Sequence, residues 1–86
     1  MRIKCAAIRH NGSVYEGESH YSIFQRMRMN GVCEELPGDD AQGFVTECGK
    51  YVRRGPALMI AIEAGQVKEG ETLNSRHLFS EDLNDI

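Results

Sequence analysis

The clearest hydrophobic pattern of the chain lies between residues 43 and 66, GFVTECGKYVRRGPALMIAIEAGQ. Residues 44–46 are β-prone and alternate in side-chain type, which predicts a short strand. Cys48-Gly49 then fits a two-residue hairpin loop, because glycine takes a positive φ readily at the second loop position. A return strand follows the loop. This hairpin would pair Glu47 with Lys50, Thr46 with Tyr51, Val45 with Val52 and Phe44 with Arg53.

A strongly apolar helix is expected directly after this hairpin. Pro56 suits the first helical position, because its φ is already helical and its missing N–H would be unpaired there. We therefore expect Gly55 to be the N-cap, the helix to run from Pro56 to Ala64, and Gly65 to follow as a left-handed C′ residue. Only Glu63 is polar within this helix. A helix that is apolar on all sides is buried on all sides, so we expect it to pack on the sheet and on a second copy of the chain, in a homo-oligomer (dimer or higher).

The first part of the chain predicts a second hairpin. Residues 3–10 have the character of a strand, Asn11-Gly12 is a strong hairpin turn signal, and residues 13–17 return. The expected pairs are Ile8 with Tyr15, Arg9 with Val14 and His10 with Ser13. Apolar residues fall on both faces of the first strand, which favours a strand covered on both sides; Ile3, Cys5 and Ala7 would share one face, and Ala6, Ile8 and Tyr15 the other.

The remaining segments complete a small mixed fold. Ser19 is a good N-cap for a helix over residues 20–29, which Asn30-Gly31 would end. Residues 32–42 are expected to form an acidic loop without periodicity, and the tail places Leu78, Phe79 and Leu83 where one more turn of structure could dock. The order β-β-α-β-β-α predicts an α+β fold, in which two hairpins form an antiparallel sheet and two helices pack against it. The length indicates a single domain over residues 1–86.

The composition narrows the classes of function. The net charge is −3 and the pI about 5.5, which argues against nucleic-acid binding, because a basic face dominates such proteins. Three cysteines, an odd number, and the absence of a signal peptide indicate reduced thiols and a cytoplasmic location. No segment approaches the ~20 apolar residues of a membrane span, so we expect no membrane partner.

Metal and catalytic chemistry find little support in the sequence. The cysteines and the histidines His10, His20 and His77 lack the spacing of a metal site. No histidine can be assigned as the base for a catalytic thiol at Cys33 or Cys48. We therefore expect no metal, no cofactor and no enzymatic activity.

Two consecutive arginines, Arg53 and Arg54, precede the expected start of the apolar helix. A helix N-terminus offers free N–H groups and partial positive charge, so this junction predicts an anion site. Phe44 would lie opposite Arg53, and Tyr51 on the same face; a ring beside an arginine suits a nucleotide, which needs stacking for its base and charge for its phosphate. The alternative is that the arginines are two solvent-exposed charges at a strand end and that Phe44 belongs to the core.

Several motifs occur together in this chain: A-A-I-R-H-N-G, then V-Y-E-G-x-x-H, G-F-V-T-x-x-G-K-Y-V-x-R, A-x-x-I-A-x-x-A-G-Q and a terminal L-F-S-E-D-L. In this combination the chain resembles a family of small phage proteins, the Thoeris anti-defence "sponge" family. The resemblance implies a protein that sequesters cyclic ADP-ribose isomers, or cyclic oligonucleotides, without cleaving them. It also implies ligand pockets that are shared between subunits paired through their helices.

The resemblance further implies which residues line the pocket. The matching positions are Phe44, Thr46 and Tyr51 in the hairpin and Arg54 at its end, with Ser80-Glu81-Asp82 nearby and Arg9 and His20 as further candidates. The leading hypothesis is thus a cytoplasmic, oligomeric binding protein for a cyclic nucleotide signal. The alternative is a small accessory factor that inhibits or adapts a host or phage protein through the acidic loop 34–40 and the apolar helix.

Overall fold

A computed structural model describes residues 1–83 of the chain. Its elements are β1 (Ile3–His10), β2 (Ser13–Gly17), α1 (His20–Met29), a 3₁₀ turn η1 (Asp39–Ala41), β3 (Gln42–Thr46), β4 (Tyr51–Arg53), α2 (Arg54–Glu63) and α3 (Ser80–Leu83). The strands form an antiparallel sheet in the order β2-β1-β3-β4. This arrangement confirms the predicted α+β class and the β-β-α-β-β-α order, to which α3 adds one short turn of helix in the tail.

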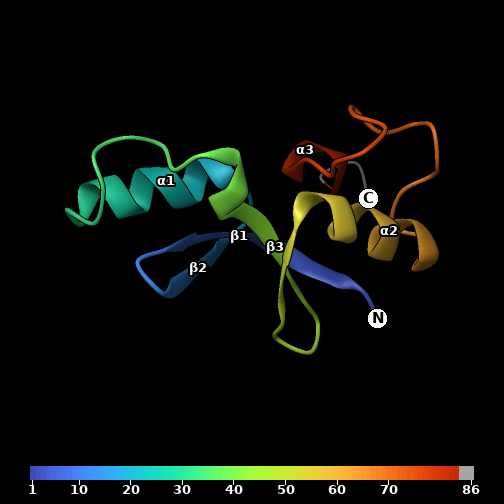
Figure 1. The fold of residues 1–86 in the computed structure, drawn as a ribbon, viewed down its shortest axis with the longest axis horizontal. Coiled ribbons are helices and arrows are strands. Elements are labelled where there is room, and N and C mark those ends of the chain that lie inside the picture. Colours follow the sequence, from blue (N-terminus) through green and yellow to red (C-terminus); the bar gives the residue numbers. More distant parts are fainter. Residues whose placement is uncertain (84–86) are drawn as a thin grey trace.

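Within residues 1–83 the helices lie on one side of the sheet, and no helix of these residues covers the other side (Figure 1). Helix α1 packs against β1 and β2, whereas α2 packs against β3, β4 and β1. The core therefore lies between the sheet and the helices. Its buried members are Ile3, Ala6, Ile8, Ile23, Met27, Phe44, Ala57, Leu58, Ala61 and Leu78.

The local signals of the first part of the chain are confirmed. Asn11 and Gly12 have φ values of 50° and 82°, as a primed two-residue turn requires, and Ile8 pairs with Tyr15 as expected. Helix α1 has the predicted bounds. The Ser19 side chain accepts a hydrogen bond from the Ser22 N–H, and the Ser22 hydroxyl caps the backbone of Ser19 in return, which satisfies N–H groups that a helix start leaves unpaired.

The predicted register of the second hairpin is wrong by one residue. The observed pairs are Gly43 with Arg53, Phe44 with Val52 and Val45 with Tyr51. The Thr46 N–H donates to the Lys50 carbonyl over 2.9 Å, so the loop has three residues, and Gly49 takes the left-handed conformation at φ 88°. A three-residue loop that ends in a left-handed glycine is a common alternative to the two-residue loop. Because a slip of one residue exchanges the faces of a strand, Phe44 and Arg53 lie on opposite faces of the sheet.

The predicted face of Ile3 is also wrong. The register of β1 against β3 shifts between Ile3 and Cys5, and such an irregularity changes which face the following residues point to. Ile3 therefore joins Ala6 and Ile8 in the core instead of sharing a face with Cys5. Ala7 is fully buried on the face without helices.

The burial of Ala7 has a local explanation on β4. A Cβ atom placed on Gly43 would lie 2.6 Å from the Tyr51 hydroxyl and 2.7 Å from its ring, so the ring of Tyr51 crosses Gly43. Since Gly43 pairs with Ala7, the tyrosine ring covers this part of the sheet. A glycine is needed at position 43 because any side chain would collide with the Val52 carbonyl and displace that ring.

Helix α2 begins earlier than predicted. Arg53 is the N-cap, with extended backbone angles, and Arg54 is the first helical residue; Gly55 is not the cap. Pro56 then occupies the third position, which is tolerated because the first N–H groups of a helix have no partner within it. The expected left-handed residue after the helix is confirmed, since Gly65 has a φ of 73°. This earlier start places the Arg54 side chain on the covered side of the sheet.

Candidate functional site

Arg54 is a buried cation at the first turn of α2. Its side chain is only 8% exposed. Its Nη1 donates to the Leu78 carbonyl over 2.9 Å, and its Nη2 donates to Gln42 Oε1 over 2.7 Å. The guanidinium thereby joins the start of β3, the start of α2 and the C-terminal tail.

Among residues 1–83 no carboxylate lies within ion-pair distance of the Arg54 guanidinium. Within residues 1–83 the ion pairs are Lys4 with Glu16 and Arg53 with Asp40, and neither includes Arg54. Its Nε is buried and lacks a hydrogen-bond partner among the described residues. Burial lowers the pKa of the guanidinium, but an arginine stays charged in a protein. A buried cation without a paired anion is costly, so an anionic ligand would be stabilised here.

His20, the first residue of α1, lies against this guanidinium. Its Nδ1 is 3.5 Å from Arg54 Nη2, and its Nε2 is 2.7 Å from the Gly43 carbonyl oxygen. Because arginine only donates, Nδ1 must accept, and Nε2 therefore carries the hydrogen that it donates to Gly43. The pKa of His20 is lowered by burial and, to a lesser extent, by the positive charge of Arg54. The imidazole is thus held in one neutral tautomer.

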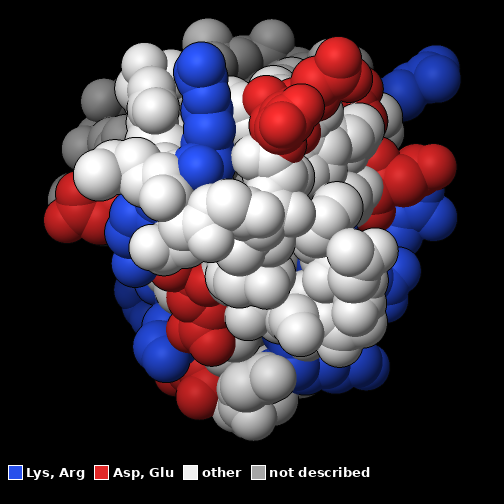
Figure 2. Space-filling model, turned by 90° about the vertical axis from the view of Figure 1, so that its left-hand side faces the viewer, with Lys and Arg blue, Asp and Glu red and all other residues white. Residues whose placement is uncertain are grey.

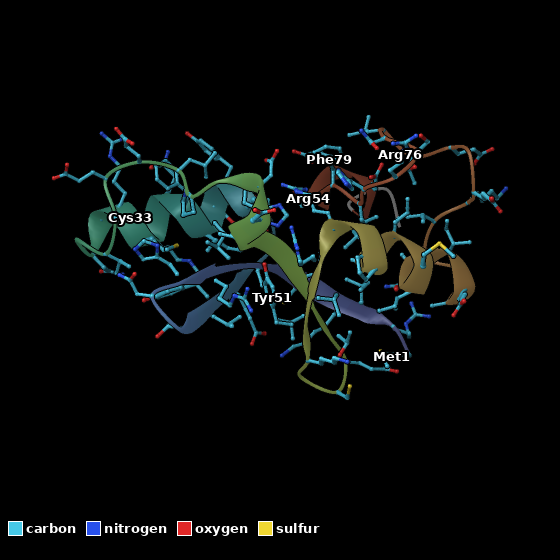
Figure 3. All side chains as sticks on the ribbon, viewed as in Figure 1. Met1, Cys33, Tyr51, Arg54, Arg76 and Phe79 are labelled. Carbon is cyan, nitrogen blue, oxygen red and sulfur yellow. The ribbon has the colours of Figure 1, made fainter. Side chains whose placement is uncertain are left out.

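These two side chains line a cleft of about 330 Å³ between α1 and the tail. The remaining lining residues are Tyr21, Phe24, Leu36, Gln42, Phe79, Ser80 and Glu81. The Phe79 ring stacks on the guanidinium, whose carbon lies 4.6 Å from the ring centre, and Figure 3 shows the two side chains close together on the helix side. A cation among aromatic rings suits a ligand that combines a flat ring with an anionic group.

The sheet separates this cleft from three of the residues that the sequence grouped with it. Arg9, Tyr51 and Arg53 lie on the face without helices, because their paired positions put them on the side of Gly43 and Val45. The Arg9 guanidinium lies 5.0 Å from the centre of the Tyr51 ring. The Tyr51 hydroxyl donates to the Ala41 carbonyl over 3.0 Å. In Figure 3, Tyr51 and Arg54 lie on opposite sides of the sheet.

The other two expected pocket residues are buried outside the cleft, Phe44 behind His20 and Thr46 beside the hairpin loop. Phe44 is fully buried and meets the His20 ring edge to face, with the ring centres 5.1 Å apart. Thr46 is also fully buried, and its hydroxyl accepts from the Lys50 N–H over 3.2 Å within the hairpin loop. Phe44 therefore positions His20, in keeping with its alternative interpretation as a core residue, and neither side chain lines the cleft.

Gln42 and Phe79 were missed by the reasoning from sequence. Gln42 was assigned to an irregular loop, and Phe79 was considered only as a residue that docks the tail. The signal for Phe79 was present in the terminal L-F-S-E-D-L motif, of which only Ser80-Glu81-Asp82 was taken as part of the pocket. The role of Gln42 depends on the true start of β3, which periodicity does not reveal.

Two features of residues 1–83 bear on the class of site. Within residues 1–83, no cluster of three or more His, Cys, Asp or Glu side chains is placed to hold a metal ion. No helix in the same residues has the length and apolar character that crossing a membrane requires. The end of the molecule in Figure 2 shows acidic and basic side chains side by side around an uncharged centre, so this face is not the continuous basic surface of a nucleic-acid binder.

Comparison with known proteins places the chain in a family. The family model described as phage T4 y16D protein matches residues 2–84. The chain belongs to this family. The phage origin implied by the sequence motifs is thereby supported. Searches of curated proteins and of solved structures gave no match.

Proposed function

We propose that this member of the phage T4 y16D family binds and sequesters a cyclic ADP-ribose-type signal, or a cyclic oligonucleotide, in the cytoplasm of the infected host. The observation that carries the proposal is the buried Arg54 guanidinium, which lines a cleft yet has no carboxylate partner among residues 1–83. A phosphate group is the ligand that best satisfies such a guanidinium. Phe79 and the aromatic rings of α1 would hold the base.

The geometry of His20 favours binding without cleavage. Its Nδ1 faces Arg54 and its Nε2 donates to the Gly43 carbonyl. A general base needs a free lone pair within reach of the substrate, and both ring nitrogens of His20 are already engaged. The histidine therefore serves to orient the arginine, and the ligand is retained intact.

The size of the cleft favours completion by a second copy. Its volume of about 330 Å³ is near the lower end of the ~300–1,000 Å³ typical of ligand pockets. Beside α2, a groove of about 510 Å³ is lined by the apolar Met1, Val52, Pro56, Ile60 and Ala64 and by the charged Arg2, Lys50 and Glu63. Met59 of the same helix is 58% exposed. We infer that the apolar side of α2 packs against another protomer, as its sequence predicts.

Light scattering on Ile60→Glu tests this assembly. A charge in the α2 groove is expected to dissociate the oligomer, whereas Leu73→Glu, at an exposed position in the tail, should leave it intact. Circular dichroism of both variants identifies any loss of fold. A stable monomer in the unmutated protein contradicts the proposed assembly.

Mass spectrometry of the bound small molecule tests the function itself. The protein is mixed with cyclic ADP-ribose isomers and cyclic oligonucleotides, freed of unbound ligand, and denatured. Release of an intact ligand supports sequestration, and release of a hydrolysed product identifies an enzyme instead.

The protein-binding alternative rests on an exposed apolar residue in an acidic loop. Leu36 is 52% exposed and lies between acidic residues in the segment 34–40. A thermal shift screen separates the two hypotheses, because a ligand that binds the folded state raises the melting temperature by mass action. No shift with any nucleotide, together with co-purification of a defined protein, favours the accessory factor.

A further inference from the structure

The hydrogen-bond partners of the Arg54 guanidinium among residues 1–83 are all neutral. The Leu78 carbonyl accepts from Nη1 over 2.9 Å, and Gln42 Oε1 accepts from Nη2 over 2.7 Å. Nδ1 of the neutral His20 lies 3.5 Å from the same Nη2. No carboxylate of these residues lies within ion-pair distance, and the acidic side chains that affect the pKa of Arg54 do so from farther away. The side chain is thus held in place without being neutralised.

Gln42 is the partner of Arg54 for which an amide and a carboxylate are close alternatives. Leu78 contributes a backbone carbonyl, which is neutral whatever the residue, whereas position 42 contributes a side chain. Glutamate has nearly the same shape as glutamine and is the usual kind of partner for a buried arginine, since buried charges are normally paired. Gln42 is only 7% exposed, so a carboxylate at this position would form a buried ion pair with Arg54 and cancel the positive charge of the cleft.

Both ends of the Gln42 amide are engaged. Its Nε2 donates to the Pro37 carbonyl over 2.8 Å, and its Oε1 accepts from Arg54. A carbonyl only accepts and an arginine only donates, so these two partners fix which end of the amide faces which. Gln42 thereby joins Arg54 to the acidic loop 34–40, whose Leu36 lines the same cleft. The amide thus positions the guanidinium and one wall of the cleft together.

We propose that Gln42 determines the anion specificity of this cleft, because its neutral amide positions Arg54 and leaves the charge of Arg54 free for a phosphate. The inference rests on the site of the proposed function and adds a specificity-determining residue to it. It applies to a ligand with one phosphate group and to a diphosphate alike, since an uncompensated guanidinium attracts both. A carboxylate at position 42 would compete with every such ligand for the same N–H donors.

Two substitutions of Gln42 separate this role from a purely structural one. Gln42→Glu keeps an oxygen acceptor for Arg54 and adds a negative charge, whereas Gln42→Met stays neutral and removes the acceptor; both lose the bond to Pro37. Isothermal titration at pH 7.5 measures the affinity for cyclic ADP-ribose isomers and for inorganic pyrophosphate, which lacks base and sugar.

The two variants should differ in the order of their affinities. Gln42→Glu should weaken binding of both kinds of ligand by at least about tenfold, because a new like charge then lies a few ångströms from the ligand. Gln42→Met should weaken it by less than about fivefold, because only the preorganisation of Arg54 is reduced. A purely structural glutamine predicts the opposite order, since glutamate resembles glutamine more closely than methionine does.

Gln66→Glu is the matched control. The Gln66 amide also bridges two backbone groups, the N–H and the carbonyl of Ile3, each over 2.8 Å, and its hydrogen bonds within residues 1–83 are to Ile3 alone. This variant should keep the pyrophosphate affinity of the unmutated protein. Should circular dichroism show that Gln42→Glu does not fold, Phe79→Glu supplies a carboxylate from the tail, because the Phe79 ring centre is 4.6 Å from the guanidinium carbon. It should bind pyrophosphate at least about tenfold more weakly than Phe79→Gln, its neutral counterpart.

The possible results separate this inference from the proposed function. If Gln42→Glu binds pyrophosphate at least as tightly as Gln42→Met, or if Gln66→Glu loses as much affinity, the role of Gln42 is refuted and the proposed function stands. If pyrophosphate behaves as expected but no cyclic ADP-ribose isomer or cyclic oligonucleotide binds, the proposed function falls and the cleft remains an anion site controlled by Gln42. If the unmutated protein binds none of these ligands, pyrophosphate included, both fall.

Discussion

The two faces of the sheet place adjacent arginines in opposite environments. Arg53 lies on the face without helices, where its side chain is 61% exposed and pairs with Asp40. Arg54 turns to the covered face, where it is 8% exposed and has no carboxylate within ion-pair distance in residues 1–83. The same side-chain chemistry thus becomes a solvated charge on one face and an unsatisfied charge on the other.

This difference shows why the covered face holds the candidate site. An exposed ion pair contributes only about 0–1 kcal/mol, because water already solvates both charges. A buried guanidinium without a counter-ion has lost that solvation and gains more from a bound anion. The presence of an arginine in the sequence is therefore a poor guide to anion binding. Its burial in the folded protein is a better guide.

The largest expected difference between the faces is in packing. Phe44→Ala should lower the free energy of unfolding by about 3–5 kcal/mol, because it opens a cavity in the core. Val14→Ala, on the other face at 42% exposure, should change it by less than about 0.5 kcal/mol. Urea denaturation of both variants measures the two values. Should Phe44→Ala not fold, Ile8→Val is a milder core deletion, which should lower the free energy of unfolding by about 0.5–1.5 kcal/mol. Equal losses of unfolding free energy on the two faces would contradict the assignment of the core.

The second largest expected effect is the difference in nucleotide affinity between variants of Arg54 and of Arg53. Arg54→Gln should weaken nucleotide binding by about 10- to 100-fold, because a charged hydrogen bond contributes about 1.5–3 kcal/mol. Arg53→Gln should change it by less than about twofold, since Arg53 is engaged with Asp40 in solvent. Isothermal titration compares the dissociation constants, and circular dichroism confirms that both variants fold. Equal losses in the two variants would place the ligand on both faces or on neither.

The smallest expected effect is the contribution of His20 to the pH dependence of stability. Its pKa in the folded state is lowered from 6.5, first by burial, so the unfolded chain binds the proton more readily. Stability therefore rises with pH in this range, and it falls as the pH drops through about 6.5 toward the folded pKa. Thermal melts between pH 7.5 and 5 should show a weaker pH dependence in His20→Gln, whereas His77→Gln, at an exposed position, should behave like the unmutated protein. An unchanged slope in His20→Gln would show that His20 is not held neutral.

Three signals confined to a few neighbouring residues were predicted correctly from the sequence, although the loop at Gly49 and the N-cap of α2 were not. The Asn11-Gly12 turn, the Ser19 cap of α1 and the left-handed Gly65 after α2 all occur where they were expected. Each depends on the φ preference or hydrogen bonding of residues that are adjacent in the chain. The fold class follows from the order of the elements, so it too could be predicted.

The candidate site could be predicted only in part. Arg54 and His20 line the cleft as expected, but Arg9, Tyr51 and Arg53 lie across the sheet from it. One residue of register in the second hairpin accounts for much of this difference, because it exchanges the faces of the paired side chains. Both a two-residue and a three-residue loop suit the local sequence around Gly49, and the packing of Phe44 into the core favours the second.

The amino-acid sequence by itself thus determined the elements, their order and the residue types available for binding an anion, because these depend on local backbone preferences. Only the tertiary structure decided which arginine is buried. The cause is non-local: the start of α2 turns Arg54 under the tail, where the Leu78 carbonyl and the Phe79 ring hold it beside residues from α1 and β3. Contacts between residues so far apart in the chain form only when the whole sheet and its helices pack together.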